Sequence, residues 1–117
     1  MANPRSAHYS AMKAAIIHLT KNIAKTYGQH HIRANCVCPA IVISEDLQAL
    51  KAEAMRKFNV SEEEALWTYA CEEFGAHYFL ERLGELREVA AAVSFLMSDQ
   101  ASLVTGAVLN VDGGTDF

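Results

Sequence analysis

The 117-residue chain has room for one domain at most, and its composition of 51% hydrophobic and 21% charged residues is ordinary for a globular protein. It carries 10 basic and 14 acidic residues, a net charge of -4, and no basic block. This balance argues against nucleic acid or an anionic membrane as a partner. No apolar run approaches the roughly 20 residues of a membrane span, and the N-terminus lacks an apolar signal-peptide core. We therefore expect a cytoplasmic protein.

The first predicted element is a helix from about Pro4 to Tyr27. Asn3 is a suitable N-cap, proline suits the first helical position, and apolar residues recur at helical intervals up to Gly28, which we expect to end the helix. Residues 32–38 are then short and apolar and precede Pro39, a pattern typical of a buried strand. Because a helix precedes this strand, we predict that it pairs in parallel.

The stretch from Ser44 to Arg82 predicts two helices, at about residues 45–58 and 61–74. Ser61 and Glu64 form a capping-box pattern at the start of the second helix. Most of the chain's large aromatic side chains are concentrated in this stretch. The residues alone leave two interpretations open: a lid over an apolar substrate, or a small separate core.

The C-terminal part predicts a helix at residues 87–97, a loop at 98–102 and a strand at 107–111. Asp112 precedes Gly113-Gly114, and we expect its side chain to organise a turn or a subunit contact at the end of the strand. Strands that alternate with helices indicate an α/β protein with parallel pairing and right-handed crossovers. Because two strands alone make a poor sheet, the sequence looks like part of a larger one.

The cysteines and histidines give no sign of a disulfide or a metal site. Cys36 and Cys38 lie two residues apart on one strand face, a poor geometry for a mutual disulfide, and Cys71 is distant in sequence. We expect reduced, mostly buried thiols. The pair His30-His31 lacks a third ligand at a suitable spacing, so we predict no metal site.

The most pointed chemical feature is the pair Tyr9 and Lys13, one helical turn apart. Side chains at this spacing rise from the same helix face, with Cβ atoms roughly 5–6 Å apart. An ammonium beside a phenol favours the phenolate form, which can exchange a proton with a carbonyl or alcohol oxygen. A surface helix can also carry this pair without any function, so the spacing by itself is weak evidence.

Several motifs in order along the chain resemble the short-chain dehydrogenase/reductase family. Tyr9-Ser10-Ala11-Met12-Lys13 stands first, and a strand with Asn35 before Pro39 follows it. The remaining motifs are Glu88-Val89-Ala90 with Phe95-Leu96-Met97-Ser98-Asp99, then Thr105-Gly106, and then Val111-Asp112-Gly113-Gly114. They occur at the family's spacing and cover essentially the whole chain.

The resemblance implies that residues 1–117 form the C-terminal half of one Rossmann-type, doubly wound domain, with residues 44–82 as its substrate lid. It implies that Tyr9 is the catalytic acid/base. Lys13 would hold the hydroxyls of the nicotinamide ribose and favour the Tyr9 phenolate.

The resemblance also implies that the segment from Pro39 to Ser44 forms a wall under the nicotinamide. Pro39 and Ala40 open this wall, and Ile41 and Val42 fall where the family's backbone touches the carboxamide. Ser44 falls where a threonine hydroxyl usually meets the cofactor. Ala40 replaces the glycine that normally follows the proline, which would shift the wall if that position needs a positive φ.

The sequence shows no Gly-rich phosphate loop, no residue that would choose between NAD and NADP, and no catalytic serine of the resembled family. We therefore expect NAD or NADP as the cofactor, and the sequence does not distinguish between the two. We expect the dinucleotide-binding half to be absent from this chain, and the chain alone to be a poor enzyme or none.

Two hypotheses follow. The first is a truncated NAD(P)-dependent oxidoreductase that acts on a small-molecule carbonyl or alcohol. The second is a non-catalytic interaction module that forms a homo-oligomer or pairs with an intact family member. In the resembled family, the tyrosine-bearing helix and the last helix and strand build subunit contacts.

Overall fold

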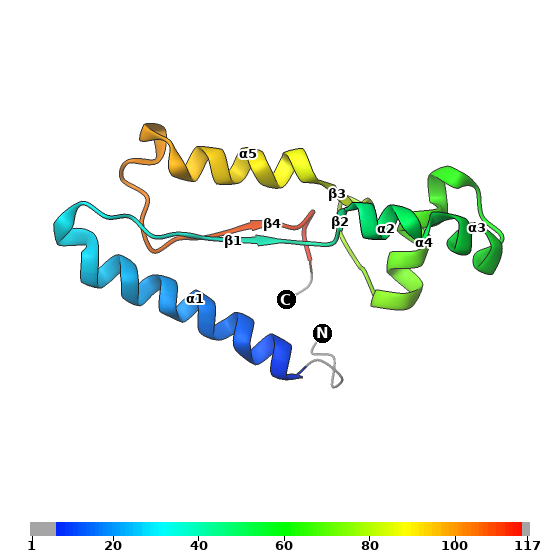
Figure 1. Ribbon diagram of the computed structural model, residues 1–117, viewed down its shortest axis with the longest axis horizontal. Coiled ribbons are helices and arrows are strands. Elements are labelled where there is room, and N and C mark those ends of the chain that lie inside the picture. Colours follow the sequence, from blue (N-terminus) through cyan, green and yellow to red (C-terminus); the bar gives the residue numbers. More distant parts are fainter. Residues whose placement is uncertain (1–6, 116–117) are drawn as a thin grey trace. The chain divides into compact units, whose positions relative to one another are not determined.

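The computed structural model describes residues 7–115 as helices and short strands (Figure 1). In chain order the elements are α1 (Ala7–Tyr27), η2 (Gly28–His30), β1 (Cys36–Pro39), β2 (Val42–Ile43), α2 (Glu45–Ala49), α3 (Lys51–Phe58), α4 (Glu62–Phe74), β3 (Gly84–Glu85), α5 (Leu86–Met97), η3 (Asp99–Ala101) and β4 (Val108–Val111). The predicted α/β class is confirmed. The predicted cap at Asn3 and helix start at Pro4 lie outside the described residues.

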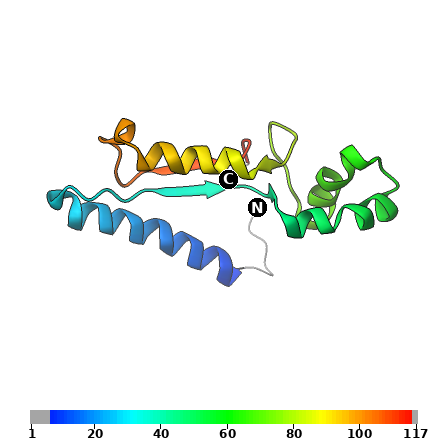
Figure 2. The same cartoon turned by 45° about the horizontal axis from the view of Figure 1, so that its top comes forward.

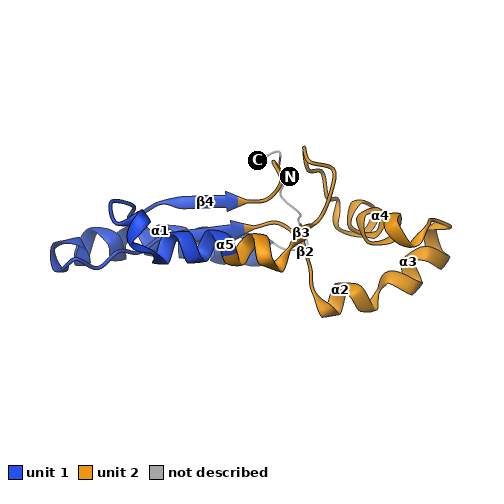
Figure 3. Cartoon of the chain, turned by 90° about the horizontal axis from the view of Figure 1, so that it is seen from above, with its two compact units in different colours: residues 1–38, 91–110 blue, residues 39–90, 111–117 orange. Residues whose placement is uncertain are grey.

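The chain divides into two compact units (Figure 3). Unit 1 contains residues 1–38 and 91–110, and unit 2 contains residues 39–90 and 111–117. Unit 1 therefore carries α1 and the start of β1, while unit 2 carries the wall segment 39–44 and the helices α2 to α4.

Helix α1 is long and uninterrupted (Figure 2). It ends at Tyr27, directly before Gly28 as predicted, but the left-handed residue that closes the turn is His31, with φ of 60° and an N–H that donates to Gly28 O. Ala24 is the one buried residue of α1. A Cβ placed on Gly106 would lie 3.5 Å from the Ala24 Cβ, an ordinary van der Waals contact, so it is the positive φ of 67° that favours glycine here.

In unit 1, two polar side chains join the segment before β1 to the chain around β4. The Arg33 guanidinium donates to Leu96 O (2.7 Å), Val104 O (3.1 Å) and Ser98 O (3.3 Å), so it caps carbonyls at the C-terminal end of α5. Asn35 donates to Val104 O (2.9 Å) and accepts from the Ala107 N–H (3.0 Å).

Strands β1 and β4 are hydrogen-bonded neighbours (Figure 1). The Cys36 N–H donates to Ala107 O (2.9 Å) and the Ala40 N–H donates to Val111 O (3.2 Å), so both strands advance together and the predicted parallel pairing is confirmed. The predicted start of the first strand at Ile32 is wrong, since β1 begins at Cys36. Just before β1, the Ala34 N–H bonds the Thr105 hydroxyl (3.2 Å) instead of a ladder carbonyl.

The prediction of two strands is also wrong, because unit 2 contains a second, short parallel pair. Strand β2 pairs with β3 in the register Val42 with Gly84 and Ile43 with Glu85. Each of these strands has only two residues, too few for a hydrophobic pattern to reveal them in the sequence.

The helices of unit 2 surround their own small core. Its buried members are Leu47, Leu66, Ala70, Tyr78 and Leu83, and partly buried side chains such as Trp67 pack against them. The predicted helix at 45–58 is divided at Leu50 into α2 and α3, since the Leu50 N–H closes a turn on Leu47 O (3.0 Å). Helices α3 and α4 pack on one another.

The capping box at the start of α4 is confirmed. The Ser61 side chain accepts from the Glu64 N–H (3.4 Å), and Glu64 Oε2 accepts from the Ser61 N–H (3.4 Å). Gly75 closes the helix in the left-handed conformation with φ of 66°. The sequence therefore fixes both ends of α4 locally.

Candidate functional site

Tyr9 and Lys13 lie together on one face of α1. The Lys13 Nζ is 5.3 Å from the centroid of the Tyr9 ring, a cation–π distance. The Tyr9 side chain is 59% exposed, so its hydroxyl can be reached by a small molecule. Among the described residues, no hydrogen bond is assigned to the Tyr9 hydroxyl or the Lys13 ammonium within unit 1.

The wall segment in unit 2 is held through its backbone. The Ala40 N–H donates to Val111 O, and Ala40 is not among the described non-glycine residues with positive φ, which are His31, Asn59 and Glu81. The replacement of glycine by alanine at position 40 therefore introduces no backbone strain.

Both backbone polar groups of Ile41 are engaged inside unit 2. Its N–H donates to the Tyr78 hydroxyl (3.1 Å), and its carbonyl accepts from the Gly84 N–H (3.1 Å). In a trans peptide the carbonyl of one residue and the N–H of the next point in opposite directions. No described peptide bond is cis, so the Val42 N–H points away from Gly84 and hence away from β3.

Ser44, predicted to contact a cofactor, has a structural task in unit 2. Its side chain accepts from the Leu47 N–H (3.3 Å) and so caps α2. A hydroxyl also carries a proton, so Ser44 Oγ keeps a donor for another partner while it caps the helix.

Tyr78 is a residue that the sequence pattern did not single out as functional. It is 8% exposed, and its hydroxyl is bonded to the Ile41 N–H of the wall. A buried tyrosine hydroxyl needs a hydrogen-bond partner, which is the general reason to expect such a contact. The partner is 37 residues away in the chain, so no sequence spacing could have identified it.

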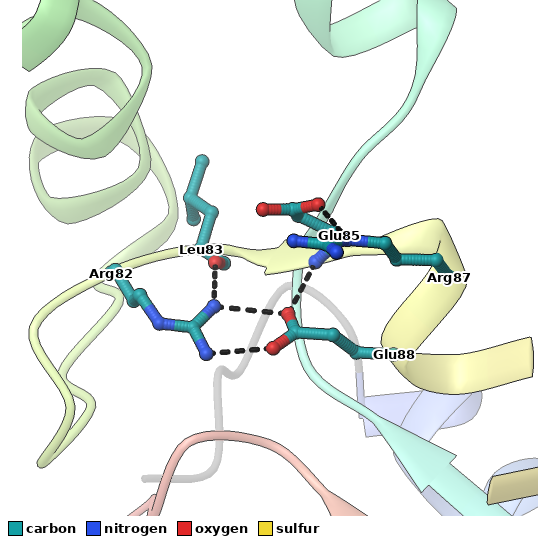
Figure 4. Close-up of polar contacts among 5 residues, drawn as sticks. All are labelled: Arg82, Leu83, Glu85, Arg87 and Glu88. Atoms are coloured by element: carbon teal, nitrogen blue, oxygen red, sulfur yellow. Dashed lines mark hydrogen bonds and ion pairs between the residues drawn. The ribbon is translucent and has the colours of Figure 1, made fainter. Parts of the chain in front are cut away.

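A cluster of charged side chains fixes the strand β3 and the first turn of α5 (Figure 4). The Arg82 guanidinium is bidentate to Glu88, at 2.9 Å and 2.7 Å, and also donates to Leu83 O (3.1 Å). Glu88 in turn accepts from the Glu85 N–H (2.9 Å), and Arg87 donates to Glu85 Oε2 (2.5 Å).

These contacts lower the pKa values of two carboxyl groups. The hydrogen bonds from Arg82 and from the Glu85 N–H lower the pKa of Glu88 to about 2. The Arg87 hydrogen bond and charge lower the pKa of Glu85 below its usual value. Both carboxylates therefore stay ionised at neutral pH and serve as fixed negative partners for arginines, not as proton donors.

A cavity of about 120 Å³ lies beside this cluster within unit 2. Its lining includes Ala40 of the wall, Arg82, Glu88 and Asp112. Pockets for drug-sized ligands are usually about 300–1,000 Å³, so this cavity is too small for a dinucleotide. Asp112 is engaged as predicted, since its carboxylate accepts from the Gly114 N–H and the Thr115 hydroxyl, both at 3.0 Å.

A larger hollow of about 510 Å³ opens on unit 1. It is lined by Arg33, Ala34, Asn35, Val37, Val93, Leu96 and Met97. None of the predicted site residues borders it. The hollow is mainly apolar, and Arg33 and Asn35 already use their polar atoms in the network around β4.

The remaining predictions concern thiols, metals and membranes. Cys36 Sγ and Cys38 Sγ are 4.0 Å apart, about twice a covalent S–S bond, and both side chains are half-buried, so the prediction of mostly buried thiols is wrong in degree. Within residues 7–115 no group of three metal-ligating side chains comes together. No helix in the same range combines the length and apolar character that a bilayer crossing needs.

The chain is similar to known oxidoreductases. A family model described as enoyl-(acyl carrier protein) reductase matches residues 1–116. The chain is 36% identical to an uncharacterized oxidoreductase of Thermotoga maritima over 96% of its own length and 41% of the relative's. It is 40% identical to galactitol 2-dehydrogenase of Rhizobium johnstonii, over 95% of its own length and 37% of the relative's.

Solved structures show the same similarity. L-sorbose reductase from Gluconobacter frateurii, complexed with NADPH and L-sorbose, matches with a TM-score of 0.74 and 27% identity over 91% of this chain and 39% of that one. A 4-hydroxyisoleucine dehydrogenase mutant complexed with NADH and succinate matches with a TM-score of 0.73 and 29% identity over 97% and 41%. The chain thus spans about two fifths of the length of its relatives.

Proposed function

The chain belongs to the short-chain dehydrogenase/reductase family. From that premise we propose that it forms all or part of an NAD(P)-dependent oxidoreductase that acts on a small carbonyl or alcohol. The observation that carries this proposal is the pair Tyr9 and Lys13, with the ammonium 5.3 Å from the ring centroid and the phenol exposed. The bound nicotinamide would supply or accept the hydride.

Tyr9 exchanges a proton at its hydroxyl oxygen with the oxygen of the substrate. In the direction of reduction, Tyr9 gives its proton to the developing alkoxide and becomes a phenolate. Lys13 stabilises that phenolate by charge, and its three N–H donors also suit the ribose hydroxyls of the cofactor.

In unit 2 the wall segment 39–44 would hold the carboxamide of the cofactor. A primary carboxamide offers one acceptor and two donors, and an unpaired strand edge offers both N–H and C=O groups. Ile41 has both of its groups engaged, so Val42 is the better candidate of the two. Ser44 keeps a hydroxyl proton to donate, while Pro39 and Ala40 set the direction of the segment.

We further propose that these 117 residues alone bind a dinucleotide weakly and turn over slowly or not at all. The cavity of unit 2 is too small for a dinucleotide, and the Gly-rich loop of this family is not in the sequence. Hydride transfer needs tight positioning, and a misplacement of about 1 Å can cost on the order of 10²-fold in rate.

The proposal of weak dinucleotide binding is tested by titrating the purified 117-residue chain with NADH and NADPH. Binding is followed by nicotinamide fluorescence or calorimetry. We expect no saturation at micromolar cofactor. Micromolar binding would overturn the proposal of weak binding while it would strengthen the proposed oxidoreductase function.

A second candidate function is self-association, and an exposed apolar stripe on α1 favours it. The large apolar side chains of this helix recur every three or four residues and are 36% to 66% exposed: Tyr9, Met12, Ile16, Leu19, Ile23 and Tyr27. Such spacing places them on one face. We propose a second copy of this chain as the partner, because two such stripes are complementary about a two-fold axis.

Sedimentation velocity over a hundredfold range of concentration separates the two candidates. A stable dimer that Leu19→Glu dissociates would support self-association through α1. A monomer at every concentration would overturn the proposal of self-association. Lys21→Glu, a charge change elsewhere on the same helix, is the matched control and should leave the sedimentation unchanged.

A further inference from the structure

Tyr78 lies where three parts of unit 2 meet. Its ring packs on the Trp67 ring of α4 with centroids 5.7 Å apart and planes tilted by 48°. Its hydroxyl accepts from the Ile41 N–H of the wall at 3.1 Å. The side chain is a member of the buried core and is 8% exposed, so these contacts are shielded from water.

The backbone on either side of Tyr78 is also held. Tyr78 forms an antiparallel bridge with Thr115, and the following residues Phe79 and Leu80 donate to Gly114 O (2.8 Å) and Gly113 O (3.0 Å). Tyr78 therefore has little freedom to move away from Ile41. Its hydroxyl is in a fixed position relative to α4 and to the C-terminal turn.

Two hydrogen bonds then determine the orientation of the wall. The Tyr78 hydroxyl orients the peptide group between Ala40 and Ile41, whose N–H it accepts. The Gly84 N–H orients the next peptide group, between Ile41 and Val42, whose carbonyl it reaches. With both planes fixed, the two backbone dihedrals of Ile41 have no remaining freedom, and the direction of the Val42 N–H is set.

We propose that Tyr78 is a positioning residue for the nicotinamide, acting through the backbone of Ile41. This inference rests on the proposed oxidoreductase function. Tyr78 does not touch the cofactor; it holds the peptide group that precedes Ile41 and so supports the next peptide group, in which the Gly84 bond directs the Val42 N–H outward from β3. Without the hydroxyl, a partly buried N–H would lose its partner, and the peptide would rotate to find another one.

The test compares wild type, Tyr78→Phe and the control Trp67→Phe in a polypeptide that joins these 117 residues to a dinucleotide-binding half of the family. Two dissociation constants are measured by calorimetry for each: one for NADH or NADPH, whichever binds more tightly, and one for ADP-ribose or its 2′-phosphate. The second ligand lacks the nicotinamide. We expect Tyr78→Phe to raise the ratio of the first constant to the second roughly tenfold, on the scale of one unsatisfied buried N–H.

A general loss of packing would weaken the binding of both ligands alike and leave the ratio of the two dissociation constants unchanged. We expect this result for Trp67→Phe, which perturbs the Tyr78 ring but retains the Tyr78 hydroxyl. An unchanged ratio in Tyr78→Phe would overturn the inference and leave the proposed function intact. If the wild-type protein binds neither NADH nor NADPH, the proposed function itself fails and this inference fails with it.

Amide hydrogen exchange of the wild type gives a second measurement that does not depend on the variant folding. The Ile41 N–H, which donates to the Tyr78 hydroxyl, should exchange as slowly as the Gly84 N–H, which donates to Ile41 O, since the two bonds hold consecutive peptide groups of the wall. Rapid exchange at Ile41 would show that the bond to Tyr78 does not persist, and it would overturn the inference. In a folded Tyr78→Phe variant, exchange at Ile41 should accelerate by at least about tenfold.

Discussion

Helix α1 of unit 1 and the helices of unit 2 carry different kinds of residue. Along α1 the candidate pair Tyr9 and Lys13 and a stripe of large apolar side chains are exposed, and Ala24 alone is buried. In unit 2 Leu47, Leu66 and Leu83 lie in a shared core, and side chains cap the N-termini of α2 and α4. The candidate proton-transfer residues therefore lie on an exposed helix, while the candidate wall segment lies in the unit that has a core of its own.

This difference means that a substitution should affect either activity or stability, depending on the unit in which it lies. An exposed side chain contributes little to stability, while a buried one contributes through packing. Four substitutions test the contrast.

The largest effect should come from Tyr9→Phe, which removes the proposed proton donor. In a polypeptide that joins these 117 residues to a dinucleotide-binding half of the family, we expect the rate of nicotinamide-linked carbonyl reduction to fall about 10²–10⁴-fold, while the melting temperature stays nearly constant because Tyr9 is 59% exposed. Tyr27→Phe, at the other end of α1 and 47% exposed, is the matched control and should retain full activity. Equal activity in both variants would remove Tyr9 from the mechanism.

The largest effect on stability should come from Leu66→Ala in α4. Leu66 is 6% exposed and belongs to the core of unit 2, so the cavity should cost about 2–5 kcal/mol in the free energy of unfolding. The same substitution at Leu103, which is 97% exposed, should change it by less than about 0.5 kcal/mol. Urea unfolding followed by Trp67 fluorescence measures both, and similar values would contradict the described core.

A smaller loss should follow from Ser61→Ala, which breaks the capping box of α4. Replacing such a cap costs about 0.5–2 kcal/mol. Ser10→Ala on the exposed face of α1 is the control, and it should be neutral or slightly stabilising, because alanine is the better helix former. Thermal unfolding of the two variants measures whether the capped start of α4 contributes to the stability of the protein, as the structure indicates.

The smallest effect, and a pH-dependent one, should come from Glu88→Gln. The pKa of Glu88 falls from 4.5 to about 2 on folding, so the carboxylate adds stability above pH 4.5 and loses that contribution as the pH falls toward 2. The melting temperatures of wild type and variant should differ at pH 6 and converge between pH 4.5 and 2. A difference that stays constant over this range would show that the Arg82 ion pair is not responsible. Added salt should also reduce the difference, because the pair is exposed.

Sequence alone determined the features that depend on neighbours along the chain. The spacing of Tyr9 and Lys13 places them on one helix face in any α-helix, and the contact between them is found. Ser61 with Glu64 specifies a helix start, and Asp112 before two glycines specifies a turn, because these hydrogen bonds join residues two or three positions apart. The α/β order follows from local patterns in the same way, while the parallel pairing of β1 with β4 was predictable from the general rule that strands alternating with helices pair in parallel.

Tertiary structure alone decided which groups meet across long stretches of chain. The two-residue strands β2 and β3 and the contact between Tyr78 and Ile41 have no signature in the sequence. Each depends on backbone groups that find partners after packing, and a partner 37 residues away leaves no period or spacing in the sequence. The sequence therefore pointed to the proposed proton-transfer pair, while the folded chain revealed what holds the wall segment 39–44 in place.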